Sequence, residues 1–145
     1  MTTKAFELLL KLMEIRKDRA VGKSRKAQTD FLSSKNISDQ LHTYAAEYDA
    51  QWVRSAQQGD TAMMLHTSAA FGQNLNSTAA NQQAETRALE KTSQRALKQA
   101  LQDSQRVRAL QDYIARRKAL LRTESEKREQ RHLEDDLSAR HRKTW

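Results

Sequence analysis

The sequence predicts an all-α protein in which two long helices form an antiparallel coiled-coil hairpin and the C-terminal helix overhangs its partner. The 145 residues include no Pro and only three Gly, so few breaks within a helix are expected. Apolar residues make up 37% of the chain and charged residues 30%, which suits a narrow apolar stripe better than a thick globular core. The apolar residues recur at alternating steps of four and three, which is the spacing of a coiled-coil seam.

The first helix is predicted over about residues 4–57. Fifteen positions at this spacing run from Phe6 to Ser55, and ten of them are apolar. A turn is predicted at residues 58–60, because Gly59 suits a helix C-terminus and Asp60 or Thr61 suits the N-cap of a following helix.

The second helix is predicted over about residues 61–140, within a single coiled-coil domain that spans residues 1–145. Its seam runs from Leu65 to Ile114, and nine of these fifteen positions are apolar. A short turn makes the helices antiparallel neighbours, so that position i faces a residue near 118 minus i. Residues beyond about 121 have no partner in the first helix and are predicted to form an unpaired basic tail.

Apolar side chains gather beside the predicted seam in both helices. Tyr44 lies one position from a seam residue of the first helix, and Phe71 lies beside the seam residue Gly72 of the second. The pairing rule predicts that the two groups form one patch near the turn: Ile37, Leu41, Tyr44, Tyr48, Phe71, Leu75, Thr78 and Gln82. Exposed apolar patches of this kind mark sites for partner proteins. The alternative interpretation is that the rings widen the seam and pack locally around Gly72.

Positive charge is concentrated in the two ends of the chain. Residues 1–28 hold 8 Lys and Arg against 3 acids, residues 29–86 hold 2 against 6, and residues 87–145 hold 16 against 9. Antiparallel pairing would bring the two basic ends together as what we call the basic arms: Lys11, Arg16, Lys17, Lys23, Arg25, Lys26, Arg106, Arg108, Arg116, Arg117 and Lys118. Such a basic end would be steered toward an acidic partner, although a solvated charged face is the alternative.

Three segments resemble a FliJ-type flagellar type III export protein. They are "LHTYAAEYDAQW" at residues 41–52, "FGQNLNSTAANQ" at residues 71–82 and "KREQRHLEDDLSAR" at residues 127–140. The resemblance covers nearly the whole chain, and the order and spacing of the segments carry it. It implies a coiled coil similar to the central-stalk hairpin of the gamma subunit of rotary ATP synthase.

The resemblance also implies partners and a location. The basic arms would contact the hexameric export ATPase and promote its assembly, and the aromatic patch would dock onto the cytoplasmic domain of the export gate. Ile37, Thr78 and Gln82 depart from the residues most expected in that gate-docking patch. Export chaperones are a further implied partner, through the tail. The implied location is the bacterial cytoplasm, peripheral at the cytoplasmic face of the inner membrane.

Other function classes receive less support from the sequence. A nucleic-acid-binding protein would share the sequence pI near 10, but acids interleave with the basic residues in "EKREQRHLEDDL". An injectisome stalk protein or a structural coiled-coil adaptor would have a similar sequence pattern. Enzymatic activity, a cofactor and a metal are not expected, because the four His residues form no metal-binding helix motif and no Gly-rich phosphate loop is present.

Overall fold

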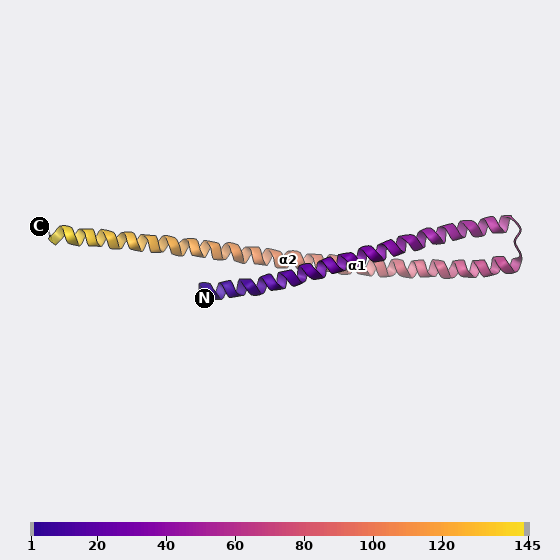
Figure 1. The fold of residues 1–145 in the computed structure, drawn as a ribbon, viewed down its shortest axis with the longest axis horizontal. Coiled ribbons are helices and arrows are strands. Elements are labelled where there is room, and N and C mark those ends of the chain that lie inside the picture. The colour runs from indigo at the N-terminus through magenta and orange to yellow at the C-terminus, as the bar shows by residue number, and fades with distance from the viewer. Residues whose placement is uncertain (1, 144–145) are drawn as a thin grey trace. The chain divides into compact units, whose positions relative to one another are not determined.

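The computed structural model describes residues 2–143, and this part of the chain consists of two α-helices joined by a turn (Figure 1). Helix α1 covers Thr3–Gln57 and helix α2 covers Ala62–Lys143. No β-strand occurs among the described residues. The predicted all-α class and the helical hairpin are therefore confirmed.

The turn between the helices satisfies the backbone groups that each helix end leaves free. Gly59 has a φ of 83°, a left-handed conformation that glycine adopts without steric cost. It lets the Asp60 amide donate to the Ser55 carbonyl oxygen (3.3 Å) and the Gly59 amide to that of Ala56 (3.4 Å), the pair of bonds that defines a Schellman cap. Helix α2 then begins with Thr61 as N-cap, because its hydroxyl oxygen accepts a hydrogen bond from the Met64 amide (3.3 Å).

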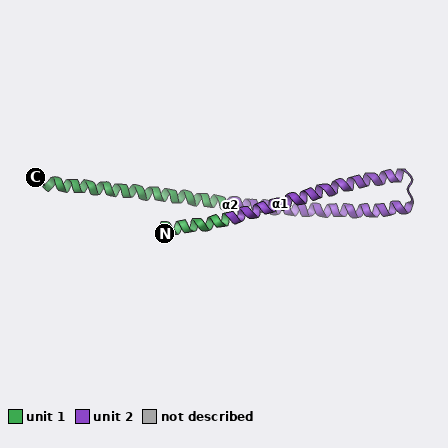
Figure 2. Ribbon diagram, in the orientation of Figure 1, with its two compact units in different colours: residues 1–17, 102–145 green, residues 18–101 purple. Residues whose placement is uncertain are grey.

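The chain divides into two compact units, which are described separately (Figure 2). Unit 2 comprises residues 18–101, where α1 and α2 pair in antiparallel fashion. The cross-helix hydrogen bonds of Gln28, Ser34, Tyr48 and Trp52 span sequence separations of 65, 52, 20 and 13 residues, so the separation shrinks steadily toward the turn.

Unit 1 pairs the beginning of α1, up to Lys17, with the part of α2 that starts at Gln102. The rings of Phe6 and Tyr113 lie 5.2 Å apart between centroids, one residue from the position opposite Phe6 that the pairing rule predicts. Residues 118–143 are exposed throughout, as the predicted overhang of the C-terminal helix requires.

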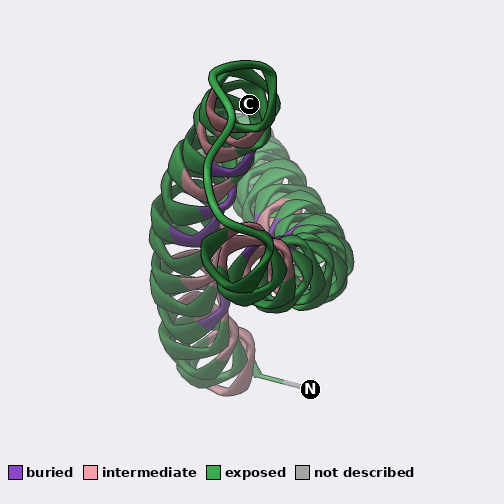
Figure 3. Cartoon of the chain, turned by 90° about the vertical axis from the view of Figure 1, so that its right-hand side faces the viewer, coloured by how far each residue is buried: buried purple, intermediate pink, exposed green. Residues whose placement is uncertain are grey.

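The interior of unit 2 is narrow and made largely of small residues, whereas unit 1 buries the larger Asp103, Val107 and Ile114 (Figure 3). The buried apolar side chains are Ala20, Ala45, Ala79, Ala100, Val107 and Ile114. The buried polar ones are Ser34, Ser38, Thr86, Ser93 and Asp103. Small side chains let two helices approach closely but bury little apolar area, so each position contributes less than a buried Leu would. Because apolar contact is limited, hydrogen bonds between the two helices, such as that between Ser34 and Thr86, help to fix the position of one helix along the other.

Candidate docking surfaces

The predicted gate-docking patch lies wholly within unit 2, four residues on α1 and four on α2. Ile37, Tyr44 and Phe71 are 47%, 50% and 48% exposed, which is high for large apolar side chains. Thr78 is also exposed, and the remaining four are half-buried: Leu41, Tyr48, Leu75 and Gln82. The patch therefore has an exposed part that a partner could cover and a half-buried part that joins the helices.

Tyr48 connects the patch to the helix interface. Its hydroxyl donates to the Ser68 carbonyl oxygen (3.1 Å), and its ring packs on Phe71 with centroids 5.0 Å apart and planes tilted by 58°. Gly72 lies beneath the ring, and a Cβ added there would stand 3.3 Å from Tyr48 Cε1. The glycine thus allows α2 to approach the Tyr48 ring closely.

Gln82 interacts with the helix seam. Its amide Nε2 donates to the Ser34 hydroxyl oxygen (2.9 Å), and the Ser34 and Thr86 hydroxyls are hydrogen-bonded at 2.7 Å. Thr86 also donates to the backbone carbonyl oxygen of Gln82 (2.9 Å). This arrangement ties Gln82 to helix pairing, whereas Tyr44 and Phe71 retain exposed ring surface.

The basic arms are distributed over both units. Unit 1 contains eight of them: Lys11, Arg16, Lys17, Arg106, Arg108, Arg116, Arg117 and Lys118. Unit 2 contains the other three, all exposed: Lys23, Arg25 and Lys26. Within unit 1, all are exposed except the half-buried Lys17 and Arg117. Most of this positive charge is therefore at the surface.

Several of these cations are held by neighbours within unit 1. Lys118 Nζ lies 2.9 Å from Glu7 Oε1, and the Arg117 guanidinium lies 4.8 Å from the centre of the Phe6 ring. The hydrogen bond and positive charge of Lys118 lower the pKa of Glu7 below its usual value. These contacts join α1 to α2 and orient part of the basic surface.

The structure also shows exposed apolar residues that the sequence patch omits. Leu8, Leu12 and Ile15 are at least half exposed and lie at steps of four and three on α1, parallel to the seam that begins at Phe6. At the start of α2, Met63 and Met64 are exposed as well. The spacing of Leu8, Leu12 and Ile15 in the sequence indicates a second apolar stripe on α1. Met63 and Met64 are adjacent and follow no helical periodicity, so the sequence pattern does not indicate them.

No group of His, Asp and Glu within residues 2–143 is arranged to hold a metal ion. Neither helix, over the same residues, contains a stretch long and apolar enough to cross a membrane.

The fold defines the class of the protein, a coiled-coil hairpin with exposed apolar side chains on both helices. The family model of the flagellar FliJ protein matches residues 3–143, and the chain belongs to this family. The resemblance predicted from the three sequence segments is confirmed, and the protein is a component of the flagellar type III export apparatus. No curated protein and no solved structure gave a match.

Proposed function

We propose that the protein is a non-enzymatic, stalk-like component of flagellar export that links the export ATPase to the export gate. The observation that carries this proposal is the exposed ring surface of Tyr44 and Phe71, contributed by both helices of unit 2. Aromatic side chains are enriched among the residues that dominate the energy of protein interfaces. Membership of the flagellar family makes the export apparatus the setting for this surface.

The gate contact is proposed to use the exposed residues of the patch. Tyr44, Phe71 and Ile37 would be buried by the cytoplasmic domain of the gate, while Tyr48 supports Phe71 from the helix interface. Gln82 would contribute through the alignment of the helices, because its amide group is bonded to Ser34.

The ATPase contact is proposed to use the basic arms. Exposed cations such as Lys11, Arg16, Arg108 and Arg116 would accelerate association with an acidic opening of the ATPase hexamer and favour assembly of the ring. The overhang after Leu121 adds further basic residues, and it is the proposed site for export chaperones. Through these partners the protein would work in the bacterial cytoplasm, peripheral at the inner membrane.

The ATPase contact can be tested by titrating the flagellar export ATPase with the purified protein and measuring ATP hydrolysis and the hexamer population. We expect stimulation that weakens in a variant truncated after Leu121 and in one with Arg108→Gln and Arg116→Gln. A matched control replaces Glu124 and Glu126 with Gln, which changes charge in the overhang without removing a cation. Absence of stimulation at any protein concentration would refute the ATPase contact and leave the gate contact standing.

Salt dependence provides a second check on the same contact. Stimulation that depends on exposed cations should weaken as ionic strength rises, because salt screens charges at the surface. Stimulation that is insensitive to salt would assign the contact to apolar residues such as Leu8 and Leu12 in place of the basic arms.

A further inference from the structure

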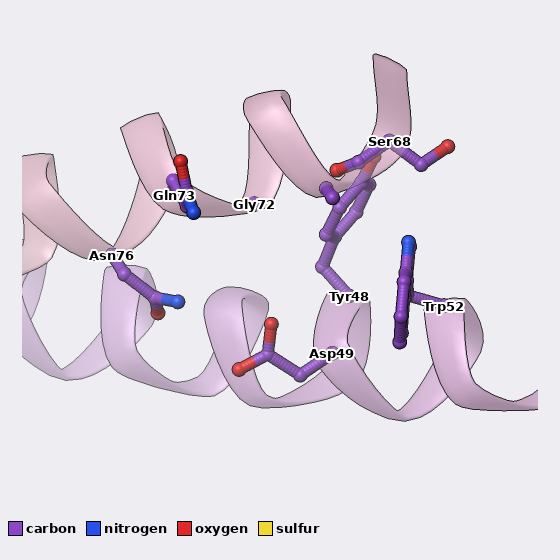
Figure 4. Close-up of a pocket in the computed structure, with 8 residues that line it drawn as sticks. Tyr48, Asp49, Trp52, Ser68, Gly72, Gln73 and Asn76 are labelled. Carbon is purple, nitrogen blue, oxygen red and sulfur yellow. The ribbon is translucent and has the colours of Figure 1, made fainter. Parts of the chain in front are cut away.

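A shallow cleft lies between α1 and α2 of unit 2, beside Gly72 (Figure 4). Its volume is about 190 Å³, and its lining residues are Tyr48, Asp49, Trp52, Ser68, Ala69, Gly72, Gln73 and Asn76. Sites for drug-sized molecules usually occupy about 300 to 1,000 Å³. The cleft therefore suits one long side chain better than a cofactor.

The cleft shares Tyr48 with the gate-docking patch, but its other lining residues lie outside that patch. Successive residues of an α-helix are rotated by about 100°, so Phe71 and Gln73 lie on opposite sides of Gly72. On α1, Tyr44 and Asp49 likewise lie on opposite flanks of the seam residues Ala45 and Tyr48. A contact in the cleft would engage the flank of the helix pair that the proposed gate contact leaves free.

Two aromatic rings form one side of the cleft, and each is held by a hydrogen bond across the helix pair. The Trp52 indole Nε1–H donates to the Leu65 carbonyl oxygen (3.1 Å), and the Tyr48 hydroxyl donates to that of Ser68 (3.1 Å). In Figure 4 the indole stands upright beside the Tyr48 ring. Because the polar atoms of both rings already have partners, the ring surfaces are what remains for a ligand.

Polar groups line the end of the cleft away from Trp52 (Figure 4). Asp49 Oδ1 lies 3.7 Å from the position that a Cβ of Gly72 would occupy, so this carboxylate reaches toward the floor of the cleft. Within residues 2–143 the Asp49 carboxylate takes part in no ion pair. The amide groups of Gln73 and Asn76 complete this end. The surrounding residues 29–86 hold 2 Lys and Arg against 6 acids, so the local field favours a cation.

We propose that the cleft receives the guanidinium group of an arginine presented by a partner protein. A guanidinium is planar, so it can pack against the aromatic side of the cleft while it donates to the Asp49 carboxylate. A lysine ammonium is a compact, strongly hydrated charge that cannot do both. The rings are already fixed before binding, which lowers the entropy lost when the arginine enters.

The cleft can be tested in the full-length protein with N-acetyl-arginine amide as the probe. The probe is titrated while the indole N–H signal of Trp52, assigned with Trp52→Phe, is followed by nuclear magnetic resonance. We expect a saturable shift with a dissociation constant on the order of millimolar, as a single side-chain contact gives. The lysine analogue should bind at least severalfold more weakly, and the uncharged, nearly isosteric citrulline analogue should not bind.

Variants of the protein test whether the Asp49 carboxylate binds the arginine probe. Asp49→Asn should weaken the arginine probe about tenfold, the loss expected for one charge-assisted hydrogen bond. Glu47→Gln removes an exposed acid of the same helix outside the cleft and should leave the affinity unchanged. Asn76→Asp adds a second carboxylate to the cleft and should tighten binding of the arginine probe. This variant keeps Asp49, so it still tests the proposal if Asp49→Asn lowers the helix content of the protein.

Several outcomes would overturn the proposal. They are the absence of a saturable shift, equal affinity for the lysine or citrulline analogue, or an unchanged affinity in a folded Asp49→Asn variant. None of them bears on the gate contact, because Tyr44 and Phe71 lie outside the cleft.

Discussion

The hydroxyl groups of Ser34 and Thr86 lie 2.7 Å apart in the interior of unit 2, where each is buried and hydrogen-bonded to the other helix. Gln82 donates to the same Ser34 oxygen from the next turn of α2 (2.9 Å). A shift of one helix along the other would break both bonds and leave polar atoms buried without partners, which is costly. This cluster therefore fixes which residues of α1 meet which residues of α2.

Ser34→Ala should lower the free energy of unfolding by about 1–2 kcal/mol, because it leaves Gln82 and Thr86 with fewer partners. Urea unfolding followed by circular dichroism measures the change. The adjacent Ser33 is exposed, so Ser33→Ala should stay within about 0.5 kcal/mol of the natural protein. Equal effects at the two positions would show that the hydroxyl cluster contributes nothing to stability.

Gly72→Ala and Gly22→Ala form a matched pair within unit 2. A Cβ at Gly22 meets nothing within 4 Å, so Gly22→Ala should stabilise the protein by about 0.5–1 kcal/mol through helix propensity. At Gly72 the same gain is opposed by contact with Tyr48 at 3.3 Å. Thermal unfolding should therefore show a higher midpoint for Gly22→Ala than for Gly72→Ala, and equal gains would contradict the close approach of the Tyr48 ring.

Tyr44→Ala combined with Phe71→Ala should abolish binding to the cytoplasmic domain of the gate while helix content stays nearly unchanged. Both side chains are about half exposed, so their removal costs less packing than removal of a core residue. Calorimetric titration measures the binding, and Leu97→Ala provides an exposed apolar control outside the patch. Collapse of the helices in the double variant would show that the rings serve local packing.

The ion pair between Glu7 and Lys118 should make unit 1 sensitive to acid. The pKa of Glu7 is lowered by the hydrogen bond and charge of Lys118, so the stabilisation is present above the usual pKa of a glutamate. It is lost as pH falls through the lowered value. A carbon-detected titration of the Glu7 carboxyl should give a higher pKa in Lys118→Gln, and an identical pKa in both proteins would show that the pair does not form.

The helical hairpin could be predicted because few residues were needed to specify it. The heptad spacing from Phe6 and the position of Gly59 together determine two antiparallel helices, and the approach of Phe6 to Tyr113 follows from them. The site was predictable only in part. Tyr44 and Phe71 lie beside the seam in the sequence and are exposed in the structure. The inward hydrogen bond of Gln82 depends on a side-chain rotamer and on the exact facing of Ser34, which a heptad pattern does not specify.

The cleft beside Gly72 was missed for a similar reason. Trp52 and Asp49 were visible in the sequence as an aromatic residue and an acid one turn apart. Their relation to Gln73 and Asn76 arises only when α2 is placed against α1 at a particular rotation. No periodic signal within either helix encodes that rotation.

Four of the five large rings of unit 2 lie toward the turn, namely Tyr44, Tyr48, Trp52 and Phe71, whereas the buried residues at the opposite end of the unit are the small Ala20 and Ala100. Dispersion attraction grows with the number of atoms in contact, so the two helices adhere more strongly around Tyr48 and Trp52 than at the other end of the unit. A mechanical load that pulls residues 18 and 101 apart would unzip this helix pair from that end. The resistance would rise as the separation reached the rings, and the turn would open last.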